Sequence, residues 1–137
     1  MIIQWDDIYN TGIKKIDKQH KKLISLLNKL LKLVKDEKIL KESKELKTVL
    51  SELIDYTNYH FETEEKYFAD FNYEDADDHI EKHHEFRGKI MKISQEYKNN
   101  ELETSYDLIE FLEDWFIDHI NGTDKRYVRL FKDKGVK

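Results

Sequence analysis

The chain has no proline in 137 residues and only four glycines, so very little in it would interrupt an α-helix. Leu, Lys, Glu and Ile are abundant, which is typical of helical bundles. The length suits one domain with a hydrophobic core and is short for two. We therefore predict an all-α protein with a single domain over residues 1–137.

Apolar residues recur at steps of three and four in four long segments, as they do in helices that bury one face. The predicted helices span residues 13–35, 43–70, 75–98 and a last segment from near Thr104 to just before Gly135. Short connections between long helices favour antiparallel neighbours, and hence an up-down-up-down four-helix bundle.

Local signals mark three of the predicted helix ends and an N-terminal arm. Ser43 is a candidate N-cap of the second helix, and Thr104 and Asp107 have capping-box spacing at the start of the fourth. Gly135 suits the C-terminal end of the fourth helix. The first ten residues should form an arm packed along the bundle by its apolar side chains, Trp5, Ile8 and Tyr9.

Composition and charge exclude several classes of protein. Without cysteine, the chain can have no disulfide, thiolate metal site or cysteine nucleophile. The net charge is −5, and acidic and basic residues are interspersed, so we expect no basic stripe and no nucleic-acid partner. The N-terminus does not resemble a signal peptide, and no apolar run approaches the roughly 20 residues that span a bilayer. A cytoplasmic protein without membrane contact is therefore expected.

The segment HIEKHHEF, residues 79–86, holds half of the six histidines. The apolar stripe of the third helix, traced back from Phe86, passes through His83 and His79. His84 lies about 100° round the helix from His83 and should face solvent. The same construction on the other helices places His20, His60, Glu64 and His119 on core stripes.

The stripe of the last helix contains a register slip. It runs from Trp115 to His119, and the next core position would be Gly122 or Thr123, neither of which suits a core. It resumes at Asp124, five residues after His119 and about 140° away on a regular helix. A single π-type turn would bring Asp124 back beneath His119, and we predict one between these two residues.

Each buried polar residue alone has an ordinary explanation, because a lone core histidine is more often a hydrogen-bonded structural group than a ligand. That explanation does not account for all of these residues together. Their positions along antiparallel helices agree, so seven polar side chains could meet in one slice of the bundle: His20, His60, Glu64, His79, His83, His119 and Asp124. Metal coordination is the least costly way to bury such a set.

Imidazoles and carboxylates without sulfur suit iron, manganese or zinc. Seven ligands exceed the needs of one ion, so two ions bridged by Glu64 and Asp124 fit better. The other common dinuclear bundle site uses two Glu-x-x-His pairs. The only such pair here, Glu81 and His84, points outward, which disfavours a ferritin-like site.

The chain resembles the hemerythrins, and specifically the single-domain bacterial members. The resemblance covers nearly the whole length and rests on the order and spacing of several motifs: Trp5 in the arm, TGIKKIDKQHKKL at 11–23, HFETEE at 60–65, His79 and His83, and WFIDHINGTDKRY at 115–127. The main departure is Glu74, which stands where proline is common before the third helix.

The resemblance implies a complete di-iron site. One iron would be held by His79, His83 and His119, and the other by His20 and His60. Glu64 and Asp124 would bridge the two irons beside a solvent-derived oxo or hydroxo group. The second iron then keeps a vacant position, which is where hemerythrins bind dioxygen.

The function expected on this resemblance is reversible binding of dioxygen for carriage, storage or sensing, with no catalytic residue and an unknown protein partner. Apolar side chains should line the open side of the site: Leu23, Ile24, Phe61, Trp115 and Phe116. Two alternatives stay open. One is a di-iron oxidoreductase acting on dioxygen, peroxide or nitric oxide, and the other is an iron buffer or structural site, including one filled by zinc.

Overall fold

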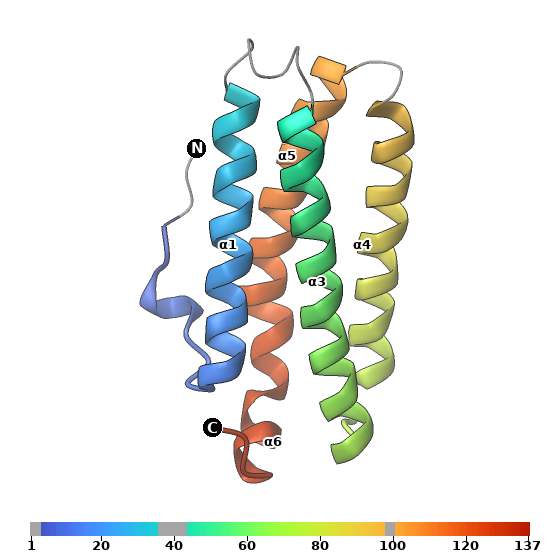
Figure 1. Cartoon of the computed structure of the whole chain (residues 1–137). Helices are drawn as coiled ribbons and strands as arrows, with labels where there is room; N and C mark the ends of the chain where they lie inside the picture. Colours follow the sequence, from blue (N-terminus) through green and yellow to red (C-terminus); the bar gives the residue numbers. More distant parts are fainter. Residues whose placement is uncertain (1–3, 36–43, 98–100) are drawn as a thin grey trace.

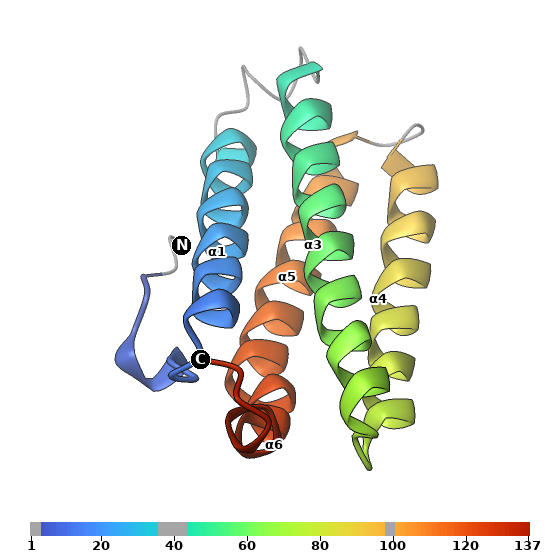
Figure 2. The same ribbon diagram turned by 60° about the horizontal axis from the view of Figure 1, so that its bottom comes forward.

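The computed structural model describes residues 4–35, 44–97 and 101–137. Its described residues are helical with no strand, and four long helices stand side by side: α1 (Lys14–Lys35), α3 (Lys44–Phe71), α4 (Ala76–Tyr97) and α5 (Glu101–Asp118) (Figure 1). Successive helices run in opposite directions, each packs against the next, and α5 closes on α1 (Figure 2). The predicted all-α, antiparallel up-down-up-down bundle is confirmed.

Specific contacts fix the ends of several helices. The Asp17 carboxylate accepts hydrogen bonds from the Thr11 N–H at 2.8 Å and the Thr11 hydroxyl at 2.7 Å, which fastens the loop before α1. Gly12 in that loop has a φ of 80°, a conformation that a residue with a Cβ rarely adopts. Gly135 ends the last helix with a φ of 87°, as predicted.

The sequence suggested caps at the starts of two helices, and the structure tests one of them. The helix α5 begins at Glu101, so Thr104 lies inside it and the predicted capping box is wrong. Residues 101–103 contain no proline or glycine, so nothing in the sequence prevents the helix from beginning before Thr104. Ser43, the other predicted cap, lies outside the described residues.

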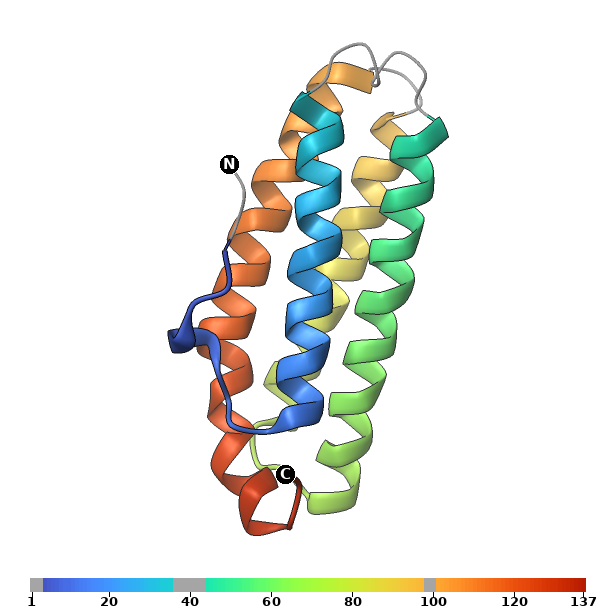
Figure 3. The same cartoon turned by 60° about the vertical axis from the view of Figure 1, so that its left-hand side comes forward.

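The N-terminal arm lies against the outside of the bundle and contains a short 3₁₀ turn, Asp7–Tyr9 (Figure 3). Trp5 and Tyr9 pack against the core, as expected. Ile8 does not, because it is 54% exposed, and its carbonyl instead accepts a hydrogen bond from the Lys125 ammonium. The expectation that Ile8 packs on the bundle is therefore wrong.

The core consists of two apolar clusters with a polar layer between them. The larger cluster includes Leu23 on α1, Phe61 on α3 and Phe86 on α4. The smaller cluster lies toward the start of α1 and includes Ile16 and Tyr127. Seven polar residues that are 0–3% exposed lie around the positions where the two clusters meet: His20, His60, Glu64, His79, His83, His119 and Asp124. We refer to these seven residues as the polar layer.

In the described part of the chain, no helix has both the length and the apolar character that a membrane crossing requires.

Candidate metal centre

The last helical segment changes pitch at the position that the sequence predicts. A π-helical stretch, His119–Thr123, follows α5 and leads into a 3₁₀ turn, Asp124–Tyr127, and then α6 (Val128–Asp133). The Asp124 N–H donates to the His119 carbonyl, five residues earlier, which is the hydrogen bond of a π-helix. The wide turn brings both side chains to the same face, and the predicted distortion is confirmed.

Asp124 lies against four histidines, which come from α1, α3, α4 and the π-helical stretch. Its Oδ1 is 2.7 Å from His119 Nε2 and 3.0 Å from His79 Nε2. Its Oδ2 is 2.7 Å from His20 Nε2 and 3.2 Å from His60 Nε2. The two oxygens therefore face two different pairs of imidazoles, as a carboxylate that bridges two ions must.

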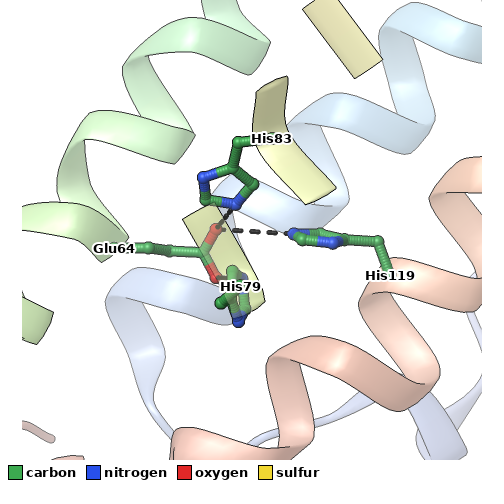
Figure 4. Close-up of side chains that lie close together, drawn as sticks. All are labelled: Glu64, His79, His83 and His119. Atoms are coloured by element: carbon green, nitrogen blue, oxygen red, sulfur yellow. Dashed lines mark ion pairs between the residues drawn. The ribbon is translucent and has the colours of Figure 1, made fainter. Parts of the chain in front are cut away.

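Glu64 also lies among the histidines of the layer (Figure 4), but its two oxygens do not divide them into the same two pairs. Its Oε1 lies 3.2 Å from His83 Nε2, 3.3 Å from His60 Nε2 and 3.5 Å from His119 Nε2. Its Oε2 lies 3.4 Å from His79 Nε2. All five predicted histidines thus turn the same ring atom, Nε2, toward two carboxylates.

Ligand atoms of the layer form two overlapping groups, each with its atoms within 4.8 Å of one another. One contains Glu64, His79, His83 and His119, and the other contains His60, Glu64, His119 and Asp124. The first group contains the predicted three-histidine site with its bridging carboxylate. The second takes His119 where the resemblance implied His20. His20 nevertheless lies 3.2 Å from His60, measured between their Nε2 atoms.

Many inward-facing atoms of the layer are buried without an aligned hydrogen bond to any described residue: both oxygens of Glu64, Oδ1 of Asp124, and Nε2 of His79, His83 and His119. Buried polar atoms without partners are costly. Ligand bonds to cations would satisfy them together, and the donor set of imidazole and carboxylate suits iron, manganese or zinc. The residues therefore fit a cation-binding centre.

The pKa values of several residues in the layer are shifted from their ordinary values. Burial raises the pKa of Glu64 and Asp124, but the surrounding imidazoles outweigh it and hold both well below their ordinary values. Burial lowers the pKa of His79, yet its contacts with the two carboxylates raise it to about 9. At His20, burial prevails and the pKa is lowered. The carboxylates are therefore ionised before any cation binds.

Two residues outside the predicted set orient histidines of the layer. Gln19, on α1, accepts a hydrogen bond from His60 Nδ1 at 2.6 Å, and Glu65, on α3, lies 3.1 Å from His83 Nδ1. Each contact fixes the ring so that Nε2 faces inward. Each residue directly neighbours a predicted ligand in the sequence and flanks a core stripe, and this adjacency is the one sequence signal that points to it.

The five apolar residues predicted for the open side lie in or against the larger core cluster. Phe61 stacks on His83 with ring centroids 3.7 Å apart, and Trp115 stacks on His119 at 4.3 Å. Both therefore cover the three-histidine half of the layer, and the Phe61 ring centroid also lies 6.3 Å from that of His60. His84, as predicted, is exposed.

A buried layer of histidines and carboxylates inside an antiparallel four-helix bundle defines a cation-binding helical domain. The comparison with protein families agrees: the hemerythrin HHE cation binding domain matches residues 11–131, and the chain belongs to the hemerythrin family. The predicted resemblance is confirmed.

Several related proteins match this chain over most of its length and most of theirs. A bacteriohemerythrin of Clostridium acetobutylicum is 29% identical over 125 residues, which cover 90% of this chain and 97% of the relative. A bacteriohemerythrin of Pseudomonas aeruginosa is 32% identical over 138 residues, covering 95% and 87%. A hemerythrin-like protein of Naegleria gruberi is 31% identical over 124 residues, covering 90% and 88%.

Proposed function

We propose that the chain binds dioxygen reversibly at two iron ions held by the polar layer. His79, His83 and His119 would hold one ion, and His20 and His60 the other, with Glu64 and Asp124 shared between them. When bound, the iron pair supplies the electrons that dioxygen takes up and returns. The observation that supports this most directly is the convergence of five Nε2 atoms on two buried carboxylates, with contacts of 2.7 to 3.5 Å.

The unequal division of the histidines supports binding of a small ligand. One half of the layer has three histidines, and the other has two, from α1 and α3. With the carboxylates shared equally, the two-histidine half has one protein ligand fewer, which leaves room for an exogenous molecule. The position of the vacancy beside His20 and His60 is part of the proposal.

Apolar packing would protect this half from water. Leu23 and Phe116 are 1% exposed and Ile24 is 5% exposed, and all three belong to the larger core cluster. We propose that they line the open side and exclude bulk water, which would otherwise promote irreversible oxidation. Phe61 and Trp115, which stack on the other half, instead hold the rings of His83 and His119 in place.

The test is anaerobic reconstitution with ferrous iron, followed by metal analysis and optical spectra before and after exposure to oxygen. We expect two irons per chain and a long-lived coloured oxygenated form that bleaches when oxygen is removed. His84→Ala, on the exposed face, is the matched control and should behave like the unmodified chain. Direct conversion to the ferric state with turnover of dioxygen, peroxide or nitric oxide would instead indicate an oxidoreductase. Preference for zinc would indicate a structural site or a metal buffer.

A further inference from the structure

The outer face of α1 differs in charge from the rest of the molecule. The helix contains eight lysines and one aspartate, a charge of +7, whereas the whole chain carries −5, so the remaining residues carry −12. Between residues 14 and 33, every exposed residue of α1 except Ser25 is a lysine. The expectation of interspersed charges without a basic stripe therefore fails for this helix.

The lysines form a continuous row. Lys14, Lys18, Lys21, Lys29 and Lys32 follow one another at helical steps, with Ser25 filling the remaining position, over about 27 Å of helix. We refer to this row as the lysine stripe. Among the residues that the structure describes, no carboxylate forms an ion pair with any of its members.

The only acidic residue of α1 does not neutralise the stripe. Asp17 is occupied by its hydrogen bonds to Thr11 and Gly12 at the start of the helix. The exposed face of α4 offers a contrast, because it carries both signs of charge, with Glu81 and Glu85 followed by Lys89. Mixed charge is what a merely solvated helix face needs, so the uniform sign on α1 requires another explanation.

A groove beside the stripe adds an apolar contact surface. It has a volume of about 350 Å³ and lies between the arm and α1, with Trp5, Ile24 and three stripe lysines, Lys21, Lys29 and Lys32, among its lining residues. Lys21 sits over the Trp5 ring, with Nζ 5.2 Å from the ring centroid. A tryptophan and an aliphatic floor surrounded by charges have the character of a protein-binding surface.

The groove is also close to the polar layer. Ile24, in its floor, is one helical turn from His20 and only 5% exposed. A molecule seated in the groove would be separated from the layer by about the 10 Å thickness of one helix. This distance suits transfer of an electron between a docked partner and the centre.

We propose that the lysine stripe and the arm groove dock an acidic electron-donor protein, of the iron–sulfur or flavin class, that returns the oxidised centre to its ferrous state. This inference rests on the proposed function. Two donor molecules would each lose one electron, and the two electrons would reduce two ferric ions, with no bond formed or broken in this chain. Complementary charge suits such a partner because electron-transfer complexes are small, weak and electrostatically steered.

The test uses an acidic [2Fe–2S] ferredoxin as the probe and compares two triple variants. One is Lys21→Glu, Lys29→Glu and Lys32→Glu in the stripe. The other is Lys66→Glu, Lys89→Glu and Lys92→Glu, exposed residues on α3 and α4 that change the net charge equally. The readouts are the second-order rate of reduction of the ferric protein by reduced ferredoxin and the dissociation constant of the complex, both against ionic strength.

We expect the stripe variant to be reduced at least tenfold more slowly at low salt, to bind at least tenfold more weakly, and to lose most of its salt dependence. The control variant should change by less than threefold. Reduced lumiflavin, a small donor without a charged docking surface, should reduce all three proteins at similar rates, which would show that the centre is intact.

Three results would overturn the inference: equal rates for the stripe variant and the unmodified chain, an equal loss in the control variant, or stripe-dependent binding of a mixed-sequence DNA duplex without any effect on ferredoxin. Failure of the proposed function is distinguishable, because it would show as no iron loading or no oxygenated form. The ferredoxin-binding titration can still be performed on the metal-free chain in that case.

Discussion

Gln19 offers a sharp test of how a hydrogen bond to the outer nitrogen of a histidine controls the polar layer. Its Oε1 accepts the His60 Nδ1 hydrogen bond at 2.6 Å, and its amide donates to Thr63 Oγ1 at 3.2 Å. Gln19→Leu preserves most of the volume of a side chain that is only 3% exposed, but it removes the acceptor. The variant thus removes the hydrogen bond by which α1, the helix that also supplies His20, fixes the ring of His60.

The expected magnitude follows from what the ring loses. Without an acceptor, His60 can rotate or change tautomer, and loss of such an outer contact typically weakens metal binding about 10- to 100-fold. That range corresponds to about 1.4–2.7 kcal/mol for one of the two ions. The ion held by the three-histidine half should be unaffected, because the hydrogen bonds of the Gln19 side chain in the described structure go to Thr63 and His60.

The assay is a competition titration of the loaded protein with a chelator, which should resolve two steps of metal release. We expect Gln19→Leu to shift one step and leave the other in place. Gln19→Glu is the control, because a carboxylate can accept the same hydrogen bond, as Glu65 does from His83. It should restore two steps close to those of the unmodified chain. A leucine variant that binds both ions with unchanged affinity would refute this role of Gln19.

Four further predictions concern the layer and its surroundings. His83→Ala should lose metal, whereas His84→Ala should keep two ions by metal analysis, and equal loading of the two variants would contradict the assignment. Removal of metal should lower the melting temperature markedly, because the ions stabilise only the folded state. In the metal-free protein, the pKa of His79 is raised to about 9 despite burial, so the stability from its carboxylate contacts is complete below about pH 6.5 and is lost as pH rises toward 9. Denaturant titrations at these two pH values should show a falling free energy of unfolding for the metal-free form but not for the loaded form, in which coordinated imidazoles are neutral. Phe116→Ala should speed decay of the oxygenated absorption band by admitting water, and an unchanged decay rate would remove this residue from the pocket.

The helices and the layer could be predicted because a single periodicity governs both. Each helix must bury one stripe, and a charged or imidazole side chain on that stripe is visible as soon as the stripe is traced. The five-residue step from His119 to Asp124 stood out for the same reason, and the π-helical stretch His119–Thr123 accounts for it. Periodicity thus predicts which residues face the interior, and at what height.

What periodicity cannot predict is the direction of contacts between neighbouring helices. Gln19 and Glu65 flank their stripes rather than lying on them, and their partners depend on how closely α1, α3 and α4 approach. The arm is a similar case. Only one three-residue turn orients Ile8, and a turn of that length has no repeating pattern from which a buried face could be traced. The stacking of Phe61 on His83 likewise depends on the rotation of one helix against another.

The π-helical turn connects the site to the packing of the whole bundle. On a regular helix, Asp124 would point about 140° away from His119 and would leave the polar layer without its second carboxylate. The change of pitch also alters the register of the residues that follow, and Tyr127 and Phe131 lie in the smaller core cluster, where both are 0% exposed. Asn121 and Gly122, which lie in the wide turn, are exposed and do not need to be packed in the core. The extra residue therefore serves the ligand geometry and the hydrophobic core together, since a regular helix through this segment would forfeit both.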